Sequence, residues 1–178
     1  MNANIIKKAN DIIKQLEDEM QSNSLRFTKK PILIGGLAME YYGMRKAGAD
    51  IDFVICDADY QTLAYENPDK RKDIWGDLGV AIGPFEIWRS IALLDYDFYK
   101  EGAIDEGAVL VVSIERLMLM RVIAMDVKKY MDDLKRIRDY YYTNFTNEDF
   151  RQEQGKHINS YKTSGGTIFA GKYTDGDE

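Results

Sequence analysis

Hydrophobic positions recur every three or four residues in two parts of the chain. Between residues 3 and 20 one face is charged and the other is an apolar stripe of Ile5, Ile6, Ala9, Ile12, Ile13, Leu16 and Met20. This spacing predicts an amphipathic helix. A second helical region covers 113–145, where Ser113 is a suitable N-cap and Glu115 stands in the first turn. Apolar residues then recur at helical spacing from Val127 to Tyr141.

Short apolar runs between these regions predict strands. "ILI" at 32–34 leads into two glycines and the start of a helix, and "DIDFVI" at 50–55 alternates polar and apolar residues. Further strand-like runs lie at 78–94 and 108–112. Strands that alternate with helices, followed by a helical section, predict a mixed α/β or α+β fold in which helices flank a small mixed sheet.

The same patterns suggest a division of the chain into three parts. Residues 1–112 would form the core together with its N-terminal helix, and 113–145 would form a C-terminal helical section. From about Thr146 the sequence is polar and rich in glycine, so we expect 146–178 to be a mobile tail.

Composition narrows the possible chemistry. The 178 residues are 45% hydrophobic, which suits one well-cored domain, and no apolar run approaches the length of a membrane span. The single cysteine, Cys56, excludes an internal disulfide and fits a cytoplasmic location. With His157 as the only histidine, a metal site would have to use carboxylates, which favour Mg²⁺ or Mn²⁺. The net charge of -6 argues against a general basic field for nucleic acid.

Two acidic residues interrupt an otherwise apolar strand. Asp50 and Asp52 would share one strand face, with Cα atoms roughly 6.5 Å apart. Like charges repel, and their burial is costly unless a cation lies between them. The pair could therefore bind a divalent metal ion. The other interpretation is an edge strand with solvated aspartates.

The glycine pair at 35–36 stands between a strand and a helix. Gly35 and Gly36 would let the backbone approach a ligand closely and direct helix N-terminal amides at a phosphate. Most such pairs are simple turns, so the pattern has weight only together with the aspartates that begin fourteen residues after Gly36.

The order strand, Gly-Gly, helix and Asp-x-Asp strand resembles the signature of the nucleotidyltransferase superfamily, which includes DNA polymerase β-like enzymes. The runs "VVSIERLMLMR" (111–121) and "DDLKRI" (132–137) are similar to the C-terminal helical pattern of AbiEii toxin-like and related minimal nucleotidyltransferases. The resemblance covers about 30–140. The chain departs from it at "RKAGA", where the family often has Arg-x-Thr, and at Asp132-Asp133, which replaces a lysine-aspartate pair.

This resemblance implies Mg²⁺- or Mn²⁺-dependent transfer of a nucleotidyl group from an NTP to an acceptor hydroxyl, with release of pyrophosphate. Asp50 and Asp52 would hold the metal, and the amides of Gly35 and Gly36 would bind the outer phosphates. A third acid would complete the metal site, where it would hold a second metal ion or accept the proton of the attacking hydroxyl. We favour Glu86, because it is an isolated charge in an apolar run, over two alternatives, Asp95 and Asp97. The cations expected at the nucleotide are Arg45, Lys46, Arg121 and Lys128, each of which could also be a solvated surface charge.

Other readings of the sequence stay open. The acceptor could be tRNA or other RNA, a protein side chain or a small molecule, and the resemblance makes a toxin–antitoxin setting conceivable. No membrane partner is expected, whereas a protein could dock on tail aromatics such as Tyr161, Phe169 and Tyr173. A catalytically silent member that binds nucleotide, nucleic acid or a partner is one alternative. A nucleic-acid-binding module is another, because the helix face from Lys128 to Arg138 is partly basic.

Overall fold

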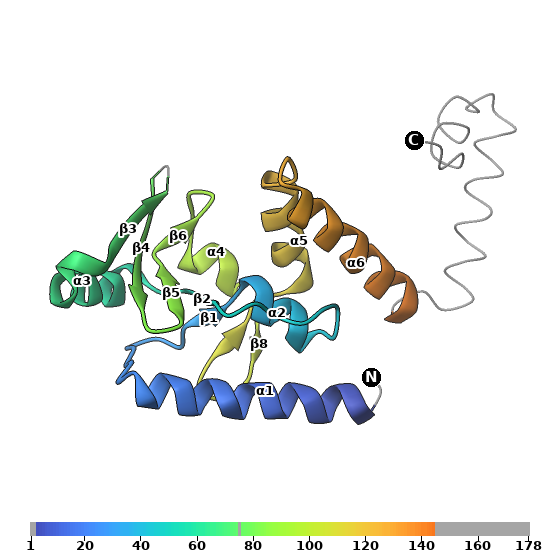
Figure 1. Cartoon of the computed structure of the whole chain (residues 1–178), viewed down its shortest axis with the longest axis horizontal. Coiled ribbons are helices and arrows are strands. Elements are labelled where there is room, and N and C mark those ends of the chain that lie inside the picture. Colours follow the sequence, from blue (N-terminus) through green and yellow to red (C-terminus); the bar gives the residue numbers. More distant parts are fainter. Residues whose placement is uncertain (1–2, 75, 145–178) are drawn as a thin grey trace, which may run out of the picture. The chain divides into compact units, whose positions relative to one another are not determined.

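The computed structural model describes residues 3–74 and 76–144 (Figure 1). The chain divides into two compact units, 1–137 and 138–178. The tail expected at 146–178, including its aromatic residues and His157, lies outside the described residues, and so do the side chains of Ile5 and Ile6.

Seven strands form one mixed sheet in the order β3-β4-β5-β2-β1-β9-β8, so the expected fold class is confirmed. Their bounds are β1 (Ile32–Leu33), β2 (Ile51–Val54), β3 (Arg71–Ile74), β4 (Asp77–Ile82), β5 (Phe85–Trp88), β8 (Ile104–Asp105) and β9 (Leu110–Val111). Strand β2 runs parallel to β5 and antiparallel to β1, and β1 runs parallel to β9. A separate hairpin consists of β6 (Ser90–Ile91) and β7 (Leu94–Asp95).

The described helices lie before, between and after these strands. They are α1 (Ala3–Ser22), α2 (Gly35–Tyr41), α3 (Asp57–Glu66), the 3₁₀ helix η1 (Pro68–Lys70), α4 (Tyr96–Lys100), α5 (Ile114–Ile123) and α6 (Lys128–Asn144). The predicted amphipathic helix is α1, whose stripe from Ala9 to Met20 is buried and which packs beside α2 (Figure 1). The predicted cap of α5 is also present, because the Ser113 hydroxyl accepts a hydrogen bond from the Arg116 N–H.

The core fixes which way the acidic residues point. Phe53 on β2 stacks on Phe85 of β5 with ring centroids 5.5 Å apart, and both side chains are fully buried. Each such burial contributes about 1.5–3 kcal/mol, so a register shift that exposed this face would be strongly disfavoured. Because side chains alternate along a strand, Asp52 and Glu86 must lie together on the opposite face of the sheet.

The structure differs from the sequence prediction at several strands, of which β2 and β3 bear on the site. Strand β3 was not predicted, because the sequence "RKDI" has no apolar alternation and largely faces solvent at the edge of the sheet. Asp50 lies just before β2 instead of inside it, since the ladder begins at Ile51, whose N–H donates to the Pro84 carbonyl at 2.9 Å. Asp50 and Asp52 are therefore less equivalent than an Asp-x-Asp strand implies.

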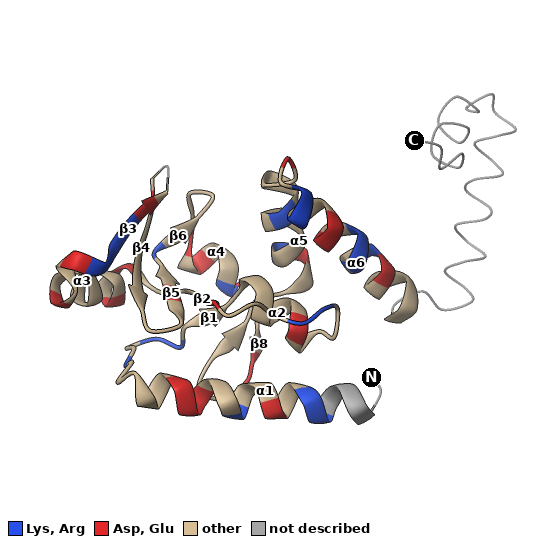
Figure 2. Cartoon of the chain, in the orientation of Figure 1, with Lys and Arg blue, Asp and Glu red and all other residues tan. Residues whose placement is uncertain are grey.

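Within the described part of the chain, none of the helices combines the length and apolar character that crossing a membrane requires. Charged residues occur on most of the elements, and acidic and basic positions alternate along α1 (Figure 2).

Candidate functional site

Asp52 and Glu86 lie side by side on neighbouring parallel strands, as register partners of β2 and β5. Burial raises the pKa of the Asp52 carboxyl group, and the negative charges of Glu86 and Asp50 raise it further. The charge of Arg121 and a hydrogen bond with the Trp88 side chain act in the opposite direction. Asp52 is thus a partly buried acid in an excess of negative charge, an environment that a bound cation would relieve.

Gly35 lies directly against the Asp52 carboxylate. Its φ of +65° is in the left-handed region, and a Cβ atom there would lie 2.1 Å from Asp52 Oδ2. The preceding residue is fixed to the same place, because the Ile34 N–H donates to the Asp52 carbonyl at 3.0 Å. Only glycine therefore allows this close approach of backbone to carboxylate.

Gly36 has no comparable steric requirement. A Cβ atom there would meet its nearest neighbour, Arg45 Nη1, at 3.5 Å, which is ordinary contact. Of the two glycines that the sequence singles out, Gly35 is the one that the geometry of the site demands.

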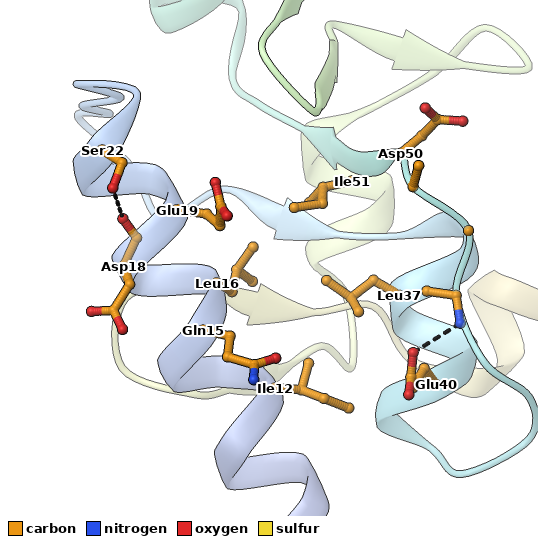
Figure 3. Close-up of a pocket in the computed structure, with 13 residues that line it drawn as sticks. Ile12, Gln15, Leu16, Asp18, Glu19, Ser22, Leu37, Glu40, Asp50 and Ile51 are labelled. Carbon is orange, nitrogen blue, oxygen red and sulfur yellow. Dashed lines mark hydrogen bonds between the residues drawn. The ribbon is translucent and has the colours of Figure 1, made fainter.

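Asp50 is exposed and borders a pocket of about 520 Å³ between α1, α2 and the segment 47–51 (Figure 3). Three further acids line this pocket, namely Asp18, Glu19 and Glu40. Glu40 also fixes the segment, because its carboxylate accepts a hydrogen bond from the Ala47 N–H at 2.8 Å. The lining contains no lysine or arginine, so a triphosphate would find no cation there.

Glu86 is the only one of the three candidate third acids that adjoins Asp52 in the sheet. Asp95 instead caps α4 by accepting a hydrogen bond from the Phe98 N–H at 3.1 Å, and Asp97 is exposed in the first turn of that helix. Glu86 already has a partner, since its carboxylate forms an ion pair with Lys72 of β3. This ion pair spans β4, which places the small residues Gly79 and Ala81 between the two side chains.

No cluster of three or more acidic, cysteine or histidine side chains within residues 3–144 is arranged to hold a metal ion. Magnesium, however, is usually bound through one or two carboxylates together with waters and substrate phosphates. Asp52 supplies a hard oxygen donor whose pKa is raised first by burial and then by neighbouring negative charge, to which Asp50 contributes. By donor chemistry alone, these two carboxylates are of the kind that hard divalent cations prefer.

Two of the four expected nucleotide-binding cations are bound to one internal carboxylate. Arg45 Nε lies 2.6 Å from Asp133 Oδ1, and Arg121 Nε lies 3.1 Å from Asp133 Oδ2. Lys46 and Lys128 are exposed. Arg45 and Arg121 are therefore fixed parts of the structure, not solvated surface charges.

Three residues near the candidate site were not predicted from the sequence, namely Lys72, Asp133 and Trp88. Lys72 lies in the polar run that was not recognised as a strand, and nothing local marks it as a partner of Glu86. Asp133 had a detectable signal, because it lies four residues before the buried Ile137 and thus on the inner face of α6. Trp88 follows Glu86 by two residues, which puts both side chains on the same strand face.

The basic face of α6 is partly neutralised by acids of the same helix. Lys135 lies 3.5 Å from Asp132, and Arg136 lies 3.6 Å from Asp133. This pairing weakens the support for a nucleic-acid-binding surface along α6, because phosphate binding depends on an excess of basic charge.

Comparison with known proteins identified no relative of this chain. No family model matches the sequence, and no curated protein or solved structure is significantly similar to the chain.

Proposed function

We propose that the protein transfers a nucleotidyl group from an NTP to an acceptor hydroxyl with release of pyrophosphate. The observation that carries this proposal is the direct contact of Gly35 with Asp52, which lies beside Glu86 on the next strand. A backbone segment that can approach a ligand only through glycine, next to a carboxylate in an excess of negative charge, suits a metal-bound triphosphate.

In this proposal the acidic residues would bind the metal ion or accept a proton, and a basic residue would stabilise negative charge. Asp50 and Asp52 would hold Mg²⁺, which when bound neutralises charge on the transferred phosphoryl group. Arg121 keeps a fixed positive charge near Asp52 and favours its ionised form. Glu86 lies on the same strand face and, once separated from Lys72, would accept the proton of the attacking hydroxyl.

A second candidate function is binding without transfer. The ion pair between Lys72 and Glu86 favours it, because a lysine here occupies the carboxylate that a second metal ion or a proton transfer would need. In this case the protein would bind Mg²⁺ and nucleotide through Asp50 and Asp52 but leave the nucleotide intact.

The test is a transfer assay with each NTP labelled at the α-phosphate, in the presence of Mg²⁺, total RNA and cell extract. The proposal predicts a labelled acceptor with the wild-type protein and at least a 100-fold loss with Asp52→Asn. The matched control is Asp69→Asn, the same change at an exposed residue of η1, which should keep wild-type transfer.

The outcomes separate the two candidates. Mg²⁺-dependent nucleotide binding that Asp52→Asn removes, without any labelled acceptor, would support the silent binder. Equal transfer by wild-type and Asp52→Asn proteins would refute the assignment of the site.

A further inference from the structure

One fully buried carboxylate lies on helix α6, most of whose charged residues are exposed. Asp133 has a side-chain exposure of 0%, and Arg45 binds it with two hydrogen bonds, from Nε to Oδ1 at 2.6 Å and from Nη2 to Oδ2 at 3.0 Å. This two-point geometry fixes both the position and the plane of the guanidinium group. Arg121 reaches the same carboxylate from α5.

These contacts join α6 to the segments around the candidate site. Arg45 follows α2, and its Nη1 lies 3.5 Å from the position of a Cβ atom on Gly36 and donates to the Lys46 carbonyl at 2.9 Å. Arg121 is close enough to Asp52 that each charge affects the pKa of the other group. The Asp133 carboxylate therefore holds two guanidinium groups. That of Arg45 lies near Gly36, and that of Arg121 lies near Asp52.

The cluster contains more positive than negative charge. Arg136 lies 3.6 Å from the same carboxylate, so three guanidinium groups share one acid. The Arg121 side chain is only 6% exposed. Its Nε–H makes no hydrogen bond within the described part of the chain, because the Asp133 oxygen 3.1 Å away is poorly aligned with that bond.

The buried charge of Arg121 is only partly neutralised, so other interactions must hold its guanidinium group in place. Burial lowers the pKa of Arg121, whereas the charges of Asp133 and Asp52 raise it. The group also stacks over Tyr130, with Cζ 4.7 Å from the ring centroid. A buried charge that shares its counter-ion with two other guanidinium groups is costly, so the carboxylate maintains Arg121 here, and an anionic ligand would lower the cost.

We infer that Asp133 is a positioning residue that holds the guanidinium groups of Arg45 and Arg121 at the site for an anionic phosphate ligand. The ligand would be the triphosphate of the nucleotide, and this part of the inference rests on the proposed function. Asp133 itself is separated from the ligand by the two arginines, so it acts through them.

The first measurement uses the wild-type protein and needs no nucleotide. The ¹⁵N NMR signals of arginine Nε–H groups are assigned with Arg45→Lys and Arg121→Lys. Hydrogen exchange at both sites should be at least 100-fold slower than in free arginine, because one Nε–H is hydrogen-bonded and the other is buried. Exchange at the rate of free arginine at either site would overturn the inference.

The second measurement compares Asp133→Asn with Asp132→Asn, the same change at the neighbouring and more exposed residue. Asp133→Asn should abolish the slow exchange of both arginines, whereas Asp132→Asn should preserve it. With Mg²⁺ and the NTP that is transferred, Asp133→Asn should raise KM at least tenfold with a smaller effect on kcat. Slow exchange retained in Asp133→Asn would overturn the inference.

A double-variant comparison separates positioning from general stability. If Asp133 acts through Arg121, adding Asp133→Asn to Arg121→Lys should raise KM far less than it does in the wild-type background. Equal effects in both backgrounds would overturn the role of Asp133 in ligand binding. Absence of binding of any of the four NTPs to the wild-type protein would refute the proposed function alone, and the exchange data would still support the positioning of the two arginines.

Discussion

Gly35 and Asp52 are in steric contact, such that no side chain larger than hydrogen fits at position 35 without displacing the carboxylate. Three atoms of Asp52, including its Cβ, lie within 2.9 Å of the place where a Cβ atom of residue 35 would stand. Rotation of the Asp52 side chain alone does not remove the conflict, because Cβ is fixed by the strand. The backbone entering α2 and the acid on β2 therefore form one unit.

Gly35→Ala should consequently affect both folding and ligand binding. The left-handed φ and the overlap with Asp52 together predict a loss of about 2–4 kcal/mol in the free energy of unfolding. Urea denaturation measures this loss, and Mg²⁺-dependent nucleotide binding should also disappear. The control is Gly36→Ala, which has room for its Cβ atom and should change stability by no more than about 1 kcal/mol. Similar stabilities of the two variants would contradict the contact.

Asp52→Asn should stabilise the protein in a pH-dependent way. The folded state raises the pKa of this carboxyl group, so the folded protein binds more protons than the unfolded chain between the two pKa values. The stability of the wild type therefore falls as pH rises through that interval, and the asparagine variant escapes this loss. Urea denaturation at pH 4 and pH 7.5 without Mg²⁺ should show a larger stabilising effect at pH 7.5. An effect that is larger at pH 4 would contradict the environment of Asp52.

Lys72→Met should strengthen divalent metal binding. Lys72 is the cation that now neutralises Glu86, and its removal leaves the carboxylate next to Asp52 without that partner. Partly exposed ion pairs are worth about 0.2–1 kcal/mol, which predicts roughly 1.4-fold to fivefold tighter binding of Mn²⁺. Titration followed by electron paramagnetic resonance measures this affinity. Lys70→Met, in the exposed turn η1, is the control, and an equal affinity in both variants would exclude competition between Lys72 and the metal.

Asp133→Ala and Asp132→Ala should differ sharply in stability although the residues are neighbours. Removal of Asp133 leaves the buried Arg121 and the bound Arg45 without their carboxylate, which should cost about 3–5 kcal/mol. Asp132 is partly exposed and pairs only with Lys135 at 3.5 Å, so its loss should cost less than about 0.5 kcal/mol. Chemical denaturation compares the two, and losses of similar size would show that Asp133 is not a structural centre.

Local sequence patterns were sufficient to predict features that lie within a single helix or strand. The stripe of α1, the cap at Ser113 and the strand that holds Asp52 all depend on residues a few positions apart. Glu86 was also identified as a candidate by a local argument, an isolated charge among apolar residues. The register partnership of Glu86 with Asp52 agrees with that choice of position.

Contacts between side chains of different helices and strands could not be predicted from local sequence patterns. Lys72 reaches Glu86 across an intervening strand, so the pair depends on the order of strands in the sheet. Asp133 appeared as one of many charges on α6, because periodicity shows which face is inward but not that two arginines from other segments converge on it. The charge balance of the site depends on these long-range partners and could not be read from the strand that contains the aspartates.

Strand β1 is among the shortest strands of the described sheet. With only two residues, Ile32 and Leu33, it joins β2 on one side to β9 on the other. The strand that bears Asp52 and the strand that leads to α5 are thus connected within the sheet by a seam of minimal length. Motion of one half of the sheet against the other would concentrate at this seam, which makes its amide hydrogens natural reporters of any closing movement when a ligand binds.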